Sequence, residues 1–165
     1  MVPILIVDDA QEDLVFAQRV LSANKILNPV HLLSSGKACL DYFAGKPSGS
    51  VIPQLPCILF LDMVMKPIGG IEVLRRLKTL PAAKGSILIM LSGLTDIKKI
   101  AEGYRQGAST FLIKPLVIAE LLQMLNSVNG LSINKVPGGI ILSIFGRHDA
   151  VIPTTFDASQ SSNFA

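Results

Sequence analysis

The chain has no tryptophan, only 5% aromatic residues and only 16% charged residues, although half of its 165 residues are hydrophobic. A core with so few aromatic rings must consist mostly of Leu, Ile, Val and Ala side chains. That composition suits parallel strands that are buried on both faces. The length allows one domain with an appendage and is too short for two ordinary domains.

Basic runs, paired cysteines and long apolar segments are also scarce. The net charge is +3, but Lys and Arg are scattered, so we expect no nucleic-acid partner. Cys39 and Cys57 lack the spacing of a metal site or redox motif, which indicates buried, reduced thiols in a reducing cytosol. The sequence has no signal-peptide pattern and no apolar run near the roughly 20 residues of a membrane span, so we expect a soluble, cytoplasmic protein without a membrane partner.

Short apolar segments alternate with segments of helical spacing along most of the chain. Strands are predicted at residues 4–7, 30–33, 57–61, 87–91 and 110–113. Helices are predicted at residues 14–21, 36–44, 71–77, 95–106 and 117–127. This alternation predicts an α/β fold, a doubly wound five-stranded parallel sheet with helices on both faces and right-handed crossovers.

The C-terminal part of the chain stands apart from this pattern. We divide the chain into a domain at residues 1–128 and a C-terminal extension at 129–165. The run IILSIF in the extension could be an added strand, a self-association element or a segment packed on the last helix, and the final ten residues look disordered. So apolar a run should pack on its own domain or on a second copy, and we favour a homodimer.

Polar side chains stand at the ends of four predicted strands: Asp8 with Asp9, then Asp62, Ser92 and Lys114. Ligands bind at the carboxyl ends of the strands in such sheets. Three carboxylates gathered there would repel one another without a cation, and Mg²⁺ prefers oxygen ligands of this kind. A lysine and a serine hydroxyl can contact phosphoryl oxygens. Together these residues provide what phosphoryl transfer to an aspartate needs.

Each residue alone has a simpler interpretation. Asp8 and Asp9 could cap a helix, Ser92 could be a cap or turn residue, and Phe111 could be an ordinary core residue. The joint occurrence of Asp8-Asp9, Asp62, Ser92 and Lys114 at separate strand ends favours a shared site.

From Ile4 to about Ser127 the chain resembles the response-regulator receiver family of two-component signalling. The resemblance is carried by the acid pair Asp8-Asp9, by Asp62 within LFLDMVMKPIGGIEVL, by Ser92 within IMLSG and by Lys114-Pro115 within GASTFLIKP. It implies the flavodoxin-like strand order 2-1-3-4-5.

The resemblance also implies roles for individual residues. Asp62 would be the phosphoacceptor. Asp8, Asp9, Asp62 and the backbone carbonyl of Val64 would hold Mg²⁺.

Other implied roles concern the phosphoryl group and the switch. Ser92 and Lys114 would contact the phosphoryl group, and the Lys114–Pro115 bond would be cis. Ser92 and Phe111 would form the switch, with Phe111 where family members often have Tyr. Val64 and Leu94 would flank the path of the water that removes the phosphoryl group.

Two features depart from the common family pattern. Pro67 lies five residues after Asp62, where relatives commonly have proline four residues on, while Gly70 keeps its usual place. The long loop at 45–56 and the tail resemble standalone receivers of the phytochrome-associated type.

The resemblance implies a non-enzymatic response regulator that catalyses only its own phosphorylation and dephosphorylation. A histidine kinase or phosphotransfer protein would be the donor, and a protein partner would dock on the face of the fourth helix, fifth strand and fifth helix. Alternatives are a receiver fragment of a larger regulator or hybrid kinase, and an aspartate-nucleophile phosphatase of the haloacid-dehalogenase type. The phosphatase needs a DxD motif, and the sequence here is Asp8-Asp9-Ala10.

Overall fold

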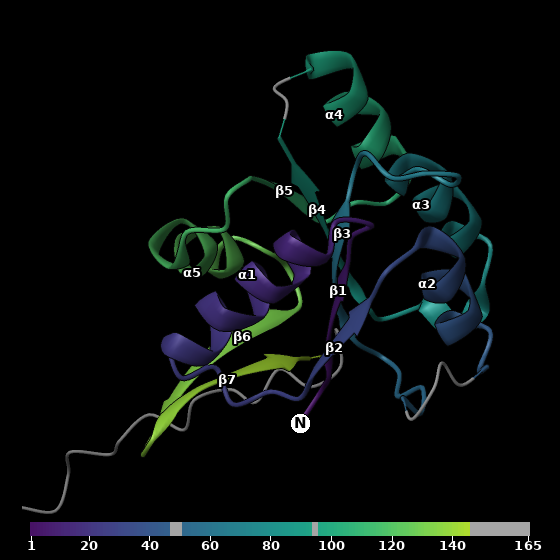
Figure 1. Ribbon diagram of the computed structural model, residues 1–165. Coiled ribbons are helices and arrows are strands. Elements are labelled where there is room, and N and C mark those ends of the chain that lie inside the picture. Colours follow the sequence, from purple (N-terminus) through teal and green to yellow (C-terminus); the bar gives the residue numbers. More distant parts are fainter. Residues whose placement is uncertain (47–50, 94–95, 146–165) are drawn as a thin grey trace, which may run out of the picture.

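The computed structural model describes residues 1–46, 51–93 and 96–145. Five parallel strands form one sheet in the order β2-β1-β3-β4-β5 (Figure 1). The strands are β1 Ile4–Val7, β2 Val30–Leu33, β3 Ile58–Asp62, β4 Ile87–Ser92 and β5 Thr110–Ile113. The helices are α1 Gln11–Ala23, α2 Gly36–Phe43, α3 Gly70–Lys78, α4 Ile97–Arg105 and α5 Ile118–Asn126, with a short 3₁₀ turn at Pro81–Ala83. The doubly wound fold and its predicted strand order are confirmed.

The helices cover both faces of the sheet because its central strands are apolar on both sides. Every residue of β1, β3 and β4 is buried. Ile4 and Ile6 pack with α1 and α5, whereas Leu5 and Val7 pack with α2 and α3. Figure 1 shows α1 and α5 on one side of the sheet and α2, α3 and α4 on the other. Strands that are buried on both faces account for the continuous apolar runs in the sequence.

Local signals define where the helices begin. The Ser35 hydroxyl accepts a hydrogen bond from the Ala38 amide (3.1 Å), which caps α2. Asp96 caps α4 in the same way, through the amides of Lys98 and Lys99. In the described part of the chain, no helix combines the length and the apolar character that a membrane span requires. Cys39 and Cys57 are free thiols buried in the core.

The C-terminal extension contains an antiparallel hairpin of β6 Leu131–Val136 and β7 Gly139–Ile144, in a sheet of its own. One side of the hairpin, with Leu131 and Leu142, joins the core cluster under α1 and α5. The other side carries Ser132, Asn134 and Ser143, which are hydrogen-bonded through the Asn134 amide. The IILSIF run therefore packs on its own domain. The predicted disorder concerns the last ten residues, which lie outside the described residues.

Candidate functional site

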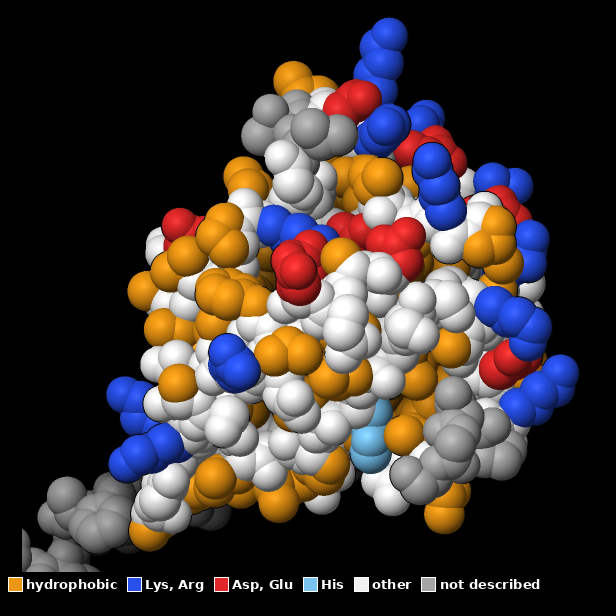
Figure 2. Space-filling view, in the orientation of Figure 1, with side chains coloured by type: hydrophobic (Ala, Val, Ile, Leu, Met, Phe, Trp, Pro, Cys, Tyr) orange, Lys and Arg blue, Asp and Glu red, His pale blue; other side chains and the backbone are white. Residues whose placement is uncertain are grey.

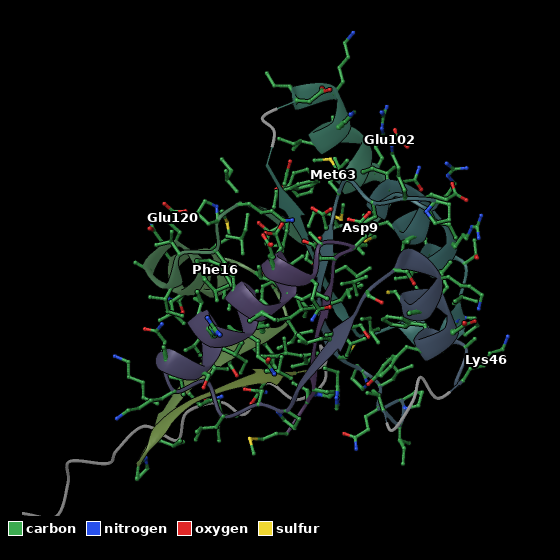
Figure 3. The ribbon with its side chains drawn as sticks, in the orientation of Figure 1. Asp9, Phe16, Lys46, Met63, Glu102 and Glu120 are labelled. Carbon is green, nitrogen blue, oxygen red and sulfur yellow. The ribbon has the colours of Figure 1, made fainter. Side chains whose placement is uncertain are left out.

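The register of the sheet brings the predicted polar residues to one edge. Val7 lies opposite Leu61 in the β1–β3 pair. Asp8 follows Val7 and Asp62 follows Leu61, so the two acids stand at the same edge of the sheet. Ser92 lies opposite Ile113 in the β4–β5 pair, one residue before Lys114. A depression of about 330 Å³ at this edge is lined by Asp8, Asp9, Ala10, Asp13, Asp62, Val64, Gly93 and Lys114. Acidic side chains gather here against a basic one (Figure 2), and Asp9 and Met63 mark the place in Figure 3.

Lys114 is the cation at the centre of this depression. Its ammonium nitrogen Nζ bonds to Oδ2 of Asp8, lies 2.8 Å from Oδ2 of Asp13 and 3.0 Å from Oδ1 of Asp62. Burial lowers the pKa of Lys114, but its bonds to the three carboxylates outweigh that effect and raise the pKa above its ordinary value. The lysine therefore stays positively charged at every physiological pH.

Asp62 ends a fully buried strand and is only 5% exposed, so its carboxylate lies almost entirely away from water, as does that of Asp8. Burial raises the pKa of Asp62 above the ordinary value, and the charges of Asp8 and Asp9 raise it further, whereas Lys114 opposes the shift. Placing a second cation beside this carboxylate would stabilise its charged form.

The three acids fit a divalent cation. Asp8, Asp9 and Asp62 each offer one carboxylate oxygen, and these oxygens lie within 4.8 Å of one another. Backbone amides fix two of the side chains: Ala10 N donates to Asp8 Oδ1 (2.9 Å), and Lys66 N donates to Asp9 Oδ2 (3.0 Å). Hard oxygen donors with more negative than positive charge suit Mg²⁺.

The remaining predicted residues surround this cluster. Ser92 is buried, and its carbonyl accepts a 2.8 Å hydrogen bond from the Lys114 amide. The Lys114–Pro115 peptide bond is cis, as is Lys66–Pro67. Val64 is 56% exposed at the rim of the depression. Leu94 lies outside the described residues.

Phe111 lies away from the depression and packs against α4. Phe111 is 9% exposed, and the centroid of its ring is 4.9 Å from that of the Tyr104 ring. A Cβ atom on Gly103 would come within 2.3 Å of the Phe111 ring, so the glycine provides the space for this ring.

Sequence reasoning missed Asp13 as a member of the site. Asp13 lies in the first turn of α1. Acids are common there because a negative charge interacts favourably with the positive end of the helix dipole. The contact of Asp13 with Lys114 joins residues 101 positions apart. In the sequence, the one feature that could have linked Asp13 to the site is its position four residues after Asp9.

These features define a doubly wound α/β protein with a carboxylate-rich site at the carboxyl edge of its sheet. A family model described as the response regulator receiver domain matches residues 4–126. The chain therefore belongs to the response regulator receiver domain family of two-component signalling.

Individual relatives agree with this assignment. The chain is 26% identical over 137 residues to a probable methanogenesis regulatory protein, FilR2 of Methanothrix harundinacea (strain 6Ac), covering 82% of this chain and 87% of FilR2. Several other curated relatives are longer, and the chain spans 53% or less of their length.

Solved structures share the fold. The bacteriophytochrome response regulator AtBRR superposes with a TM-score of 0.69 at 23% identity, covering 78% of this chain and 92% of AtBRR. The Mn²⁺-bound form of the response regulator Rcp1 gives a TM-score of 0.63 at 23% identity, covering 75% of this chain and 88% of Rcp1.

Proposed function

We propose that this protein is the phosphoacceptor of a two-component phosphorelay and takes a phosphoryl group on Asp62 from a histidine kinase or phosphotransfer protein. The observation that carries the proposal is the position of the Asp62 carboxylate. It is buried at the end of β3, 3.0 Å from the Lys114 ammonium and within one cluster with Asp8 and Asp9. Family membership makes a kinase or phosphotransfer protein the natural donor.

The reaction transfers a phosphoryl group from a histidine imidazole of the donor to the Asp62 carboxylate. A carboxylate oxygen of Asp62 forms a bond to the phosphorus of a phosphohistidine, the phosphorus–nitrogen bond breaks, and the imidazole leaves with the electron pair. Lys114 and the Ser92 hydroxyl contact the transferred oxygens. Asp8, Asp9, Asp62 and the Val64 carbonyl would hold Mg²⁺, which neutralises phosphoryl charge when bound. The Mn²⁺ in the similarly folded Rcp1 supports a divalent cation here.

The output of the switch would be a protein partner. Phosphoryl contacts at Ser92 and repacking of Phe111 would shift the equilibrium of the face formed by α4, β5 and α5. Exposed hydrophobic side chains on or beside this face, at Ile97, Tyr104 and Ile113, suit a protein partner better than a small ligand.

The remaining expectations stay part of the proposal. The protein would act in the cytoplasm, would turn over no substrate other than its own aspartyl phosphate, and would be either a standalone receiver or a fragment of a larger regulator. The homodimer also stays a prediction. Light scattering on the full chain and on a chain lacking residues 130–165 tests it, since an unchanged monomer in both would contradict it.

Phosphorylation with a small donor tests the main proposal. Incubating the protein with acetyl phosphate and Mg²⁺ should add one phosphoryl group, detected by intact mass, and chelation of the metal should prevent it. The Asp62→Asn variant should take up none. Asp41→Asn, which removes an acid on α2 far from the site, is the matched control and should label like the wild type. Equal labelling of Asp62→Asn would refute the assignment.

A further inference from the structure

Lys114 bonds to three carboxylates, and they are not equivalent. Asp8 and Asp62 belong to the acid cluster that suits a divalent cation, whereas Asp13 does not. Asp13 approaches from α1, and its side chain is 50% exposed at the rim of the depression. Lys114 therefore contacts the proposed metal ligands on one side and an independent acid on the other.

We propose that Asp13 is a positioning residue that draws the Lys114 ammonium toward α1 and thereby eases the binding of a divalent cation at Asp8 and Asp62. This inference rests on the metal site of the proposed function. It assigns a role to a residue outside the family's motif positions.

The reason is competition for the same oxygens. Asp8 is 2% exposed and Asp62 is 7% exposed at the side chain, so neither can gain much from water when a partner leaves. A cation that binds these carboxylates must displace part of their interaction with Lys114. If Asp13 were absent, the ammonium would have only the metal's own ligands as ion-pair partners among the described residues. With Asp13 at 2.8 Å, the lysine keeps a salt bridge while it releases the other two.

Asp13 could also act simply as one more negative charge near the metal. Glu12 separates the two effects, because it lies in the same turn of α1 and is exposed. Among the described residues, Glu12 forms no salt bridge. Glu12→Gln therefore removes one negative charge from the same helical turn without removing an ion pair of Lys114.

Calorimetric titration of the unphosphorylated full chain with Mg²⁺ tests the inference. Asp13→Asn should weaken Mg²⁺ binding by about fivefold, the size expected of a half-exposed ion pair. Glu12→Gln should change it by less than about twofold. Asp13→Glu, which keeps a carboxylate within reach of the lysine, should restore most of the affinity. Equal effects of Asp13→Asn and Glu12→Gln would overturn the inference.

A double-mutant cycle with Lys114→Met adds an independent readout. If Asp13 acts through the lysine, Asp13→Asn should have no more effect than Glu12→Gln once Lys114 is replaced. A persistent fivefold loss in that background would contradict the inference, as would a wild-type protein that binds no Mg²⁺. The titration involves no phosphoryl transfer. A protein that shows the predicted Mg²⁺ affinities and yet accepts no phosphoryl group would refute Asp62 as phosphoacceptor and leave the role of Asp13 standing.

Discussion

Asn28 and Leu142 exchange two hydrogen bonds across 114 residues of sequence. The Asn28 amide nitrogen donates to the Leu142 carbonyl, and its oxygen accepts from the Leu142 amide, both at 2.8 Å. The same amide nitrogen also donates to the Val2 carbonyl (2.8 Å). Asn28 is 4% exposed, so one buried side chain joins the hairpin to the start of the sheet.

Replacing Asn28 should therefore destabilise the whole domain. Asn28→Ala leaves the amide and carbonyl of Leu142 without these partners in a buried place, and we expect the free energy of unfolding to fall by about 2 kcal/mol in urea titrations. Asn134→Ala, on the outer side of the same hairpin, should change it by less than about 0.5 kcal/mol. Similar decreases in the free energy of unfolding for the two variants would show that the Asn28 hydrogen bonds do not hold the hairpin to the sheet.

Replacing Gly103, which lies against the Phe111 ring, should change the free energy of unfolding through two opposing effects. Helix propensity alone would make Gly103→Ala stabilising by about 1 kcal/mol. The added Cβ would lie 2.3 Å from the Phe111 ring, and overpacking of this kind costs about 1–3 kcal/mol. We expect a net loss of stability in urea titrations, and recovery when Phe111→Leu is added. A more stable single variant would show that the ring moves aside freely.

The sheet and most of the candidate site could be predicted from the sequence, whereas the contacts of Asp13 and Asn28 could not, and the reasons are physical. The sheet and the cluster of Asp8, Asp62 and Lys114 follow from local patterns, because buried parallel strands are continuous apolar runs and their carboxyl ends share one edge. The contacts of Asp13 and Asn28 depend on how α1 and the hairpin pack against the sheet. An acid in a first helical turn and an asparagine before a proline both have ordinary local interpretations, so the sequence gives no sign of their partners.

Asp62 should make stability depend on pH. Its pKa is raised in the folded protein above the ordinary 3.8, so the folded protein binds a proton that the unfolded chain has already lost. The contribution of Asp62 to the free energy of unfolding is therefore most favourable at a pH below its pKa in the unfolded chain. This contribution is lost as the pH rises through its pKa in the folded protein. Without metal, Asp62→Asn should raise the free energy of unfolding at about pH 7, and the difference should shrink toward about pH 4.

Asp41 provides the control for this pH dependence. Its hydrogen bond from Lys37 lowers the pKa of Asp41, so Asp41→Asn should not stabilise the protein at about pH 7. Adding Mg²⁺ should stabilise the wild type and narrow its gap to Asp62→Asn, because a ligand that binds only the folded state raises its stability. An unchanged gap would contradict a metal site at Asp62.

The phosphorylated state should be long-lived. Hydrolysis of an aspartyl phosphate needs a water aligned behind the phosphorus, and the resemblance puts Val64 and Leu94 beside its path. Val64 lies at the rim of the depression and offers no hydrogen bond from its side chain. We expect Val64→Asn with Leu94→Glu to lose its phosphoryl group several times faster than the wild type at the same Mg²⁺ concentration. Equal or slower loss would mean that these positions do not control the water.

The most direct test of the central claim is to locate the phosphoryl group on the chain. Protein phosphorylated with acetyl phosphate and Mg²⁺ is treated with borohydride, which reduces an aspartyl phosphate to homoserine, and the product is sequenced by tandem mass spectrometry. We predict homoserine at position 62 and at no other acid. A modified residue elsewhere, including Asp8 or Asp9, or an unmodified Asp62 in fully phosphorylated protein, would contradict the assignment.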